Sequence, residues 1–438
     1  MRRIVSFSFV LLVALPALPA AAQPGPLVLT GATIHPVSAP AIEDGVLVVA
    51  EGRVQAVGAA GAVAVPAGAD VRDVSGLVIL PGLVDTHSHV GRVEGGDRSA
   101  PLHPEVRVLD AVDVRADSLK RALAGGITTV NVMSGSGLLM SGQTAYLKLR
   151  RDPRTIDDWL FCDDPLTDIC GGMKMANGTN PIRDQPPAPG TRAKSAALVR
   201  ELFVEAQDYR RKLETLGDDP GKAPSRDLGL EAVLEIFDGK RTVHNHTHRH
   251  DDILTALRLG KEFGYVPVLH HVSEGWKVAD EIAAAGAPAS IIVLDSPGGK
   301  HEAADLRWDT GRILEEAGVD VAFHTDDYIT DSRLFLRSAA LAVRAGMSRE
   351  KALEGLTLAG ARMLDLEDRI GSLEPGKDAD FVILSGDPFS TYTHVLETWV
   401  EGEQVFDRED PEDRAYAVGG YGVYQRERLH AHHGEGVD

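Results

Sequence analysis

The run Leu80-Pro81-Gly82-Leu83-Val84-Asp85-Thr86-His87-Ser88-His89 decides the fold class of this chain. Its apolar first half is typical of a buried strand. Side chains alternate along an extended strand, so His87 and His89 point to the same side. Two imidazoles on one side of a strand end can bind a single metal ion. The run therefore predicts a strand that carries metal ligands at its carboxyl end.

Similar apolar runs alternate with helical patterns through residues 80–365. Eight runs have the length and composition of strands: Leu80–Val84, Ile127–Val132, Thr144–Leu149, Gly172–Met175, Thr242–His246, Val266–His270, Ser290–Leu294 and Asp320–His324. The segment Arg192–Leu216 has apolar residues at a period of 3.6, which predicts an amphipathic helix. Eight strands that alternate with helices favour an α/β fold, a (β/α)8 TIM-like barrel. An open nucleotide-binding sheet is disfavoured, because the sequence has neither a Gly-x-Gly-x-x-Gly run after the first strand nor a Walker A lysine.

Short strand-like segments lie on both sides of the barrel region. Residues 23–79 and 366–408 consist of short β-type runs separated by Gly, Pro and Asp turns. We expect these two segments to pair into one small composite β-sandwich domain. Residues 409–438 are expected to form a C-terminal tail.

Residues 1–22 have the anatomy of a cleaved secretory signal. Arg2 and Arg3 begin the segment, Ile4–Leu18 is mostly apolar, and Ala20-Ala21-Ala22 supplies small residues before the expected cleavage site. No later run approaches the length of about 18 apolar residues that a membrane-spanning helix needs. We therefore expect an exported protein, periplasmic or secreted, without membrane insertion after signal cleavage.

The net charge of the chain excludes some classes of binding partner. Its 438 residues include 45 Lys and Arg against 65 Asp and Glu, a formal net charge of -20. So acidic a chain repels phosphates, which argues against nucleic acid and anionic membranes as partners. The expected partner is a small-molecule or short-peptide substrate, and a homo-oligomer stays open. Cys162 and Cys170 are the only cysteines, and in an oxidising compartment they could form one disulfide or stay as two thiols.

Ligand-type side chains follow five of the predicted strands. Besides His87 and His89 they are Lys174 on the fourth strand, His244, His246, His248 and His250 on the fifth, His270 and His271 on the sixth, and His324 and Asp326 on the eighth. Active sites of such barrels lie at the carboxyl ends of the strands, where all of these fall. Period-two alternation points the four fifth-strand histidines to one face. They cannot all bind one ion, so the sequence leaves open which of them ligates.

These motifs resemble the amidohydrolase superfamily, and within it the imidazolonepropionase-like and Xaa-Pro-dipeptidase-like branch. The similarity covers nearly all of the chain after residue 22 and includes Gly371–Asp380, which looks like the closing motif of that family. The resemblance implies these metal ligands: His87, His89, His246, His271 and Asp326. It also implies that Lys174 matches the lysine that relatives with two metals carbamylate, and that His248 lies close to the substrate.

Histidine and carboxylate ligands with an open position suit zinc, as one or two ions, with manganese, iron or cobalt as alternatives. Zinc lowers the pKa of bound water toward about 7 and so supplies hydroxide at neutral pH. In the expected reaction Asp326 takes the proton from water and returns it to the leaving nitrogen of an amide. His248, His270 and His324 would orient the carbonyl or the oxyanion. The candidate partners of a substrate carboxylate are Arg183, Arg192 and Arg249.

Three reactions compete for this site. In the superfamily that the chain resembles, deaminases and imidazolonepropionases generally have a glutamate two or three residues after the fifth-strand histidine. Here His246 is followed by Thr247, His248 and Arg249. The sequence therefore favours a hydrolase that cleaves a linear amide, as a peptidase or an N-acyl amino acid amidohydrolase does. It disfavours cyclic-amide opening and deamination. A barrel that binds metal or solute without catalysis is the remote alternative.

Overall fold

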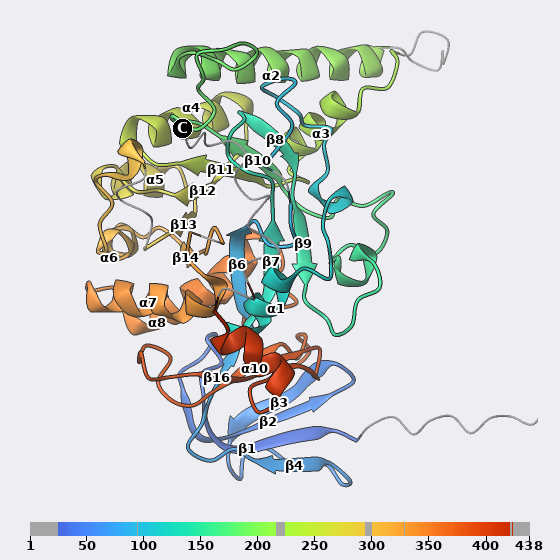
Figure 1. Cartoon of the computed structure of the whole chain (residues 1–438), viewed down its shortest axis with the longest axis vertical. Helices are drawn as coiled ribbons and strands as arrows, with labels where there is room; N and C mark the ends of the chain where they lie inside the picture. Colours follow the sequence, from blue (N-terminus) through green and yellow to red (C-terminus); the bar gives the residue numbers. More distant parts are fainter. Residues whose placement is uncertain are drawn as a thin grey trace, which may run out of the picture.

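The computed structural model describes residues 25–93, 95–215, 224–293, 300–327, 329–420 and 423 (Figure 1). The predicted secretory signal and residues 424–438 of the predicted tail lie outside the described residues. The fold is mixed α/β, and its strands form three sheets. None of the helices in the described part of the chain is long and apolar enough to cross a membrane.

Strands from both ends of the chain share the largest sheet, which lies at the bottom of Figure 1. Its order is β17-β16-β15-β5-β1-β2-β3, with β4 paired to β1. The two ends meet where β15 runs antiparallel to β5, with Ile383 opposite Ile79. The strands are β1 (Leu27–Ile34), β2 (Ile42–Ala50), β3 (Arg53–Ala59), β4 (Asp70–Asp73), β5 (Val78–Pro81), β15 (Phe381–Leu384), β16 (Val395–Val400) and β17 (Glu403–Asp407).

The other two sheets carry the histidine-bearing strands. One has the order β6-β7-β9 and the other β14-β13-β12-β11-β10-β8. Pairing is parallel from β10 through β14, and every residue of these five strands is buried, the histidines included. The strands are β6 (Leu83–Ser88), β7 (Ile127–Val132), β8 (Met140–Gln143), β9 (Ala145–Lys148), β10 (Met173–Ala176), β11 (Val243–Thr247), β12 (Val268–His271), β13 (Ala289–Ile291) and β14 (Val321–Phe323).

Two strand predictions need correction. The predicted strand Leu80–Val84 is not one strand, because the chain leaves the largest sheet at Pro81 and enters the next sheet at Leu83. Gly82 makes this switch against Thr128, whose Oγ1 would lie 2.1 Å from a Cβ at that position. In addition, β9 pairs antiparallel with β7. The link between these two strands contains β8 and no helix, and a parallel pair needs a crossover of a dozen or more residues, usually a helix.

Ten α-helices connect and cover these sheets within the described residues: α1 (Asp117–Ala124), α2 (Arg192–Thr215), α3 (Leu228–Phe237), α4 (His250–Phe263), α5 (Ala279–Ala284), α6 (Thr310–Glu316), α7 (Phe335–Arg344), α8 (Arg349–Leu356), α9 (Leu358–Met363) and α10 (Pro411–Val418). The predicted helix at Arg192 is confirmed as α2. Helix α4 ends at Phe263 and is followed by Gly264, whose φ of 83° suits a left-handed C-cap.

The first part of the predicted tail is ordered. Asp410 caps α10 by accepting a hydrogen bond from the Glu412 amide, and Pro411 occupies the first turn. The Tyr416 hydroxyl then donates to Asp117 Oδ1 of α1 at 3.2 Å. The residues that follow 409 therefore begin as a helix bound to α1, because capping residues and a specific contact stabilise it.

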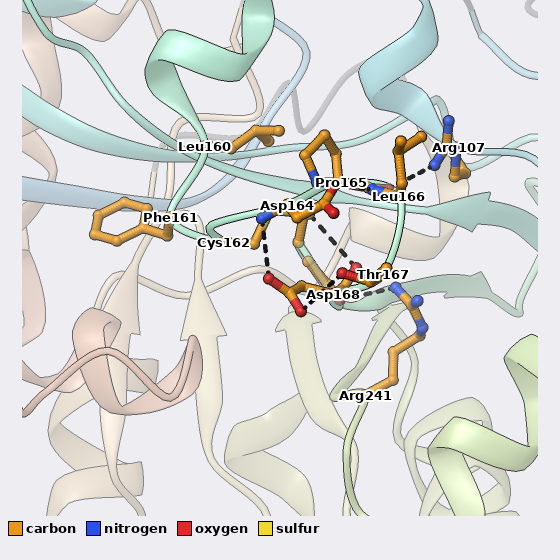
Figure 2. The surroundings of a disulfide bond; sticks show 12 residues. Arg107, Leu160, Phe161, Cys162, Asp164, Pro165, Leu166, Thr167, Asp168 and Arg241 are labelled. Atoms are coloured by element: carbon orange, nitrogen blue, oxygen red, sulfur yellow. Dashed lines mark hydrogen bonds between the residues drawn. A yellow bond between two sulfur atoms is a disulfide. The ribbon is translucent and has the colours of Figure 1, made fainter.

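Cys162 and Cys170 are joined by a disulfide (Figure 2). The bridge closes a loop in which the Asp164 amide donates to Asp168 Oδ2 at 2.9 Å. Arg107 binds this loop from outside through the carbonyl of Pro165, at 3.0 Å. The sequence left the pairing open, and the structure has the bridge.

Candidate metal centre

His87, His89 and Asp326 form the first group of candidate ligands. One ligand atom from each lies within 4.8 Å of the others, and all three side chains are buried. His89 Nε2 is 2.8 Å from Asp326 Oδ1, and His87 Nε2 is 3.4 Å from the same oxygen. His87 lies at the end of β6 and His89 directly follows this strand. The Asp326 amide donates to the His87 carbonyl at 2.9 Å. The first and last histidine-bearing strands therefore bring their predicted ligands together.

Two further groups share His271. His246, His248 and His271 offer ring nitrogens within 4.8 Å of one another, as do His87, His271 and His324. All of these side chains are buried. His271 thus lies between the histidines of β11 and those of β6, so one continuous cluster of imidazoles occupies the strand ends.

The four histidines of the fifth strand separate into three environments. His244 uses both ring nitrogens: Nε2 lies 2.8 Å from the Tyr146 hydroxyl, and Nδ1 lies 3.0 Å from His270 Nε2. His250 begins α4 and contacts Glu274 through Nδ1 at 2.6 Å. Strand β11 ends at Thr247, so the expected common face does not extend to His250. Of these four histidines, His246 and His248 belong to a candidate ligand group within the described residues.

Lys174 lies on β10 and is completely buried. Its Nζ is 3.1 Å from His87 Nε2. Burial lowers the pKa of this lysine to about 7. The predicted role of Lys174 as a metal ligand or carbamate stays a prediction.

The ring nitrogens of this cluster fit a divalent metal ion. Four buried nitrogens have no hydrogen-bond partner among the described residues: His87 Nδ1, His248 Nε2, His270 Nδ1 and His271 Nε2. Such atoms are costly to leave unpaired. Burial holds the pKa of each of these histidines well below its ordinary value, so the rings are neutral, which is the form that binds metal.

Neighbouring groups orient several rings. His89 Nδ1 donates to the Met133 carbonyl at 2.7 Å. Three other Nδ1 atoms lie close to serine hydroxyls: that of His246 is 3.0 Å from Ser136, that of His248 is 2.8 Å from Ser273, and that of His324 is 2.8 Å from Ser290. Contacts of this kind fix the ring and direct the opposite nitrogen, here Nε2, to a metal.

Asp326 is ionised and held in an unusual backbone conformation. Burial acts to raise its pKa, but the hydrogen bond and charge of His89, with the charge of Lys300, keep the pKa below its ordinary value. Its φ is 49°, a region that residues other than glycine enter rarely and often at functional sites. Asp85 of β6 fixes the preceding residue, because its carboxylate accepts from Thr325 Oγ1 at 2.5 Å and from the Thr325 amide at 3.0 Å.

Three side chains near the cluster escaped the sequence analysis. Ser136 contacts His246 as described above, and Asn180 Nδ2 lies 3.1 Å from His246 Nε2. The side chain of Lys300 has neither a hydrogen bond nor an ion pair within the described residues. Its charge nevertheless lowers the pKa of His246, His248 and Asp326. All three lie on loops, where no strand period marks them.

The arginines predicted as carboxylate partners are engaged elsewhere. Arg249 pairs with Asp251 at 2.8 Å, and Arg192 pairs with Asp252 at 3.0 Å. Arg183 donates to the carbonyls of Asn180 and Ile182. A substrate role for Arg249 stays a prediction.

Known proteins share this sequence pattern and fold. The model of the amidohydrolase family matches residues 190–406. A crystal structure of an amidohydrolase from Thermotoga maritima MSB8 is 33% identical, with a TM-score of 0.80, and the match covers 87% of this chain and 100% of that one. The chain belongs to the amidohydrolase superfamily. It is therefore a metal-dependent hydrolase of carbon–nitrogen bonds, as the sequence predicted.

More distant relatives span several activities. Imidazolonepropionase of Rhizobium rhizogenes is 26% identical over 391 residues, which is 80% of this chain and 89% of that protein. The amidohydrolase tasK of Hapsidospora irregularis is 25% identical over 78% of this chain, and the match spans only 38% of that protein. A prolidase solved with N-methylphosphonate-L-proline has 17% identity and a TM-score of 0.56, and the match covers 87% of this chain and 99% of that one. This last likeness concerns the fold alone.

Proposed function

We propose that this amidohydrolase cleaves the amide bond of a short peptide or an N-acyl amino acid. The observation that carries the proposal is the ionised carboxylate of Asp326, the one carboxylate in the candidate ligand groups of the described residues. Two other carboxylates lie near the strand ends. Glu274 binds His250 and Lys277. Glu302 accepts from the Thr179 amide through Oε2 at 2.7 Å, while its buried Oε1 has no hydrogen-bond partner among the described residues. Neither glutamate belongs to a candidate ligand group of the imidazole cluster within the described residues.

The proposed ligands are His87, His89, Lys174, His246, His271 and Asp326, with one or two zinc ions as the first choice. A bound metal of this kind polarises a carbonyl and lowers the pKa of water. Asp326 accepts the proton of the attacking water on a carboxylate oxygen and returns it to the leaving nitrogen. His248 Nε2 and His270 Nδ1, which have no hydrogen-bond partner among the described residues, would donate to the carbonyl oxygen. His324 would orient the ring of His271, because His324 Nε2 lies 3.3 Å from His271 Nδ1.

A free carboxylate on the substrate is supported by Lys300. Its positive charge lowers the pKa of His246 and of His248, and its ammonium forms no ion pair with another described side chain. A cation without a partner beside an active site suits an anionic substrate group. Lys300→Met should therefore raise KM for substrates with a free carboxylate and leave KM unchanged for the corresponding amides.

We also propose the architecture and compartment that the sequence predicted. The two sheets that hold β6 to β14 would form one (β/α)8 barrel over residues 80–365, and residues 23–79 with 366–408 would form the composite domain. Two hydrogen bonds across the strand ends support the barrel: Asp326 N to His87 O, and Thr86 Oγ1 to Ser290 Oγ at 2.6 Å. Export is supported by the pattern of residues 1–22 and by the disulfide. Amino-terminal sequencing of the protein from an exporting host should begin after residue 22.

The test is a substrate panel on the mature protein loaded with zinc, manganese or cobalt. Dipeptides and N-acyl amino acids should be hydrolysed, and a chelator should abolish the activity. Asp326→Asn should lose turnover, while Asp368→Asn on the exposed surface should keep it. Turnover of cyclic amides or nucleobases in place of linear amides would overturn the proposed substrate class, and full activity of Asp326→Asn would overturn the proposed base.

A further inference from the structure

We infer that Asn180 is a catalytic residue, whose side-chain amide donates a hydrogen bond to the substrate oxygen on which negative charge develops. The inference rests on the amide hydrolysis proposed above, in which attack on the carbonyl carbon turns its oxygen into an oxyanion. It adds a side-chain amide to the two imidazoles, of His248 and His270, that would donate to the same oxygen. Fixed donors aimed at a developing charge are usually the largest contribution to catalysis of this kind.

The side chain of Asn180 reaches into the imidazole cluster. Its Nδ2 lies 3.1 Å from His246 Nε2. The other nitrogen of that ring, Nδ1, lies 3.0 Å from the Ser136 hydroxyl. An amide nitrogen can only donate, so His246 Nε2 directs a lone pair toward Asn180. Asn180 therefore donates to the atom of His246 that is proposed to hold the metal.

A metal at His246 would change the partner of Asn180. The lone pair of His246 Nε2 can serve either the Asn180 amide or a metal, but not both. In the metal-loaded protein the amide is therefore free to donate to another acceptor beside it. A substrate carbonyl oxygen is such an acceptor, and hydrogen bonds to it strengthen as it becomes an anion. Asn180 gives up no proton in this step, because the proton of the attacking water goes to Asp326.

The backbone around Asn180 is anchored. The Thr179 amide donates to Glu302 Oε2 at 2.7 Å, and the side chain of Glu302 is buried. Gly178 has a φ of 80°, and a Cβ there would lie only 2.6 Å from the same carboxylate oxygen, so glycine permits this close approach. On the other side, the Asn180 carbonyl accepts from the guanidinium of Arg183. A donor held in this way needs no reorganisation during the reaction, which is the condition for strong stabilisation of an oxyanion.

Asn180→Ala tests the inference in the zinc-loaded protein with the best substrate of the panel described above. Removal of one oxyanion donor lowers kcat by about 10²–10³-fold. We expect a loss of that size, with KM and zinc content unchanged. Asn180→Asp should also lose kcat, because it places a second anion beside the oxyanion. Circular dichroism reports whether each variant is folded.

Two binding measurements distinguish this role from support of the metal site. Zinc affinity of Asn180→Ala, measured by competition with a chelator, should equal or exceed that of wild type, because Asn180 competes for the lone pair of His246 Nε2. Ser136→Ala is the matched control on the other side of the same ring, and its zinc affinity should fall by about 10–100-fold. A phosphonate analogue of the panel substrate has tetrahedral oxygens in place of the oxyanion. Calorimetry should show that Asn180→Ala binds this analogue more weakly by the factor by which kcat/KM falls.

A second pair of variants reaches Asn180 through its loop and leaves the cluster intact. Glu302→Ala removes the acceptor of the Thr179 amide, whereas Glu302→Gln keeps an oxygen acceptor there. Misplacement of a catalytic group by about 1 Å can cost about 100-fold in rate. We therefore expect kcat to fall by up to about 100-fold in Glu302→Ala and to recover in Glu302→Gln, which makes Glu302 a positioning residue.

The inference is overturned if folded, zinc-loaded Asn180→Ala keeps the kcat of wild type, or if it loses zinc as Ser136→Ala does. It is also overturned if this variant binds the phosphonate as tightly as wild type. Turnover of cyclic amides in place of linear ones would overturn only the proposed substrate class. The same comparison of variants then uses a cyclic amide, whose opening also forms an oxyanion. If the zinc-loaded wild type turns over no carbonyl substrate, both proposals fail.

Discussion

Replacing Lys148 by methionine should destabilise the protein more than any surface lysine change. Lys148 ends β9 and is completely buried. Its ammonium contacts Asp378, lies 2.9 Å from Asp380 Oδ2 and lies 3.3 Å from Glu401 Oε1. These acids flank β15 and β16, so one lysine joins the small three-stranded sheet to the largest sheet.

The size of the loss in unfolding free energy depends on which of the three carboxylates still has a cation beside it after Lys148 is replaced. Asp378 also binds Arg53 at 2.5 Å and Arg369 at 3.2 Å, and Glu401 also binds Arg150 at 2.7 Å. Among the described residues, Lys148 is the only cation paired with Asp380, whose side chain is 3% exposed. Removing one partner of a buried ion pair costs about 3–5 kcal/mol. Since two acids keep arginines and methionine fills most of the volume, we expect about 3 kcal/mol.

Guanidinium unfolding, followed by circular dichroism, measures this loss. The control is Lys351→Met on the surface, where the pair with Glu354 should contribute less than about 1 kcal/mol. The double variant Lys148→Met with Asp380→Asn should recover part of the loss, because it no longer buries an unpaired charge. Unfolding of Lys148→Met at the wild-type midpoint, or a double variant no more stable than the single one, would refute the reasoning.

Three further predictions concern the cluster and the loop. The metal-free protein should lose stability as pH falls below the unfolded histidine pKa of 6.5, by about 1.4 kcal/mol per pH unit for each histidine that stays neutral when folded. Urea unfolding between pH 8 and 5 measures this loss, and a flat profile contradicts it. Burial lowers the pKa in His87, His244, His246, His248, His270, His271 and His324. Tyr146→Phe leaves His244 Nε2 buried without its hydrogen-bond partner. The free energy of unfolding should fall by about 1–3 kcal/mol, and the amount of bound zinc should not change. Loss of zinc would instead make Tyr146 part of the metal site. Replacing Cys162 and Cys170 by serine opens a short loop and should cost about 2–3 kcal/mol in the same assay, and equal stability of the reduced wild type and the variant is the expected control result.

Much of the metal centre was predictable because strand geometry is local. Alternation along one strand places His87 and His89 together, and the apolar runs mark where most strands lie. His246, His271 and Asp326 follow such runs, so their gathering at one edge could be expected from the sheet. The sequence could not divide the run His244–His250, because the division depends on where β11 ends and on Tyr146, Ser273 and Glu274, which other segments supply.

Residues on loops were missed for a related reason. Ser136, Asn180 and Lys300 reach the cluster from connections whose paths are determined by packing, and a serine, an asparagine and a lysine in a loop are ordinary in any sequence. The switch of sheet at Gly82 was also hidden, since it depends on contact with Thr128 of β7. The pairing of β7 with β9 was missed because strand direction depends on the connection.

By itself, the sequence determined the α/β class, the family and the residue types of a metal-dependent hydrolase, since these depend on short-range periodicity and on motifs a few residues long. Folding in three dimensions determines which ring nitrogens face the cluster and places Lys148 among buried acids. It also gives His271 and Val272 the left-handed backbone conformation that turns the His271 ring toward the cluster. The physical reason is distance along the chain. Hydrogen bonds that fix a ring and charges that compensate a buried ion come from residues far apart in sequence, and only folding brings them together.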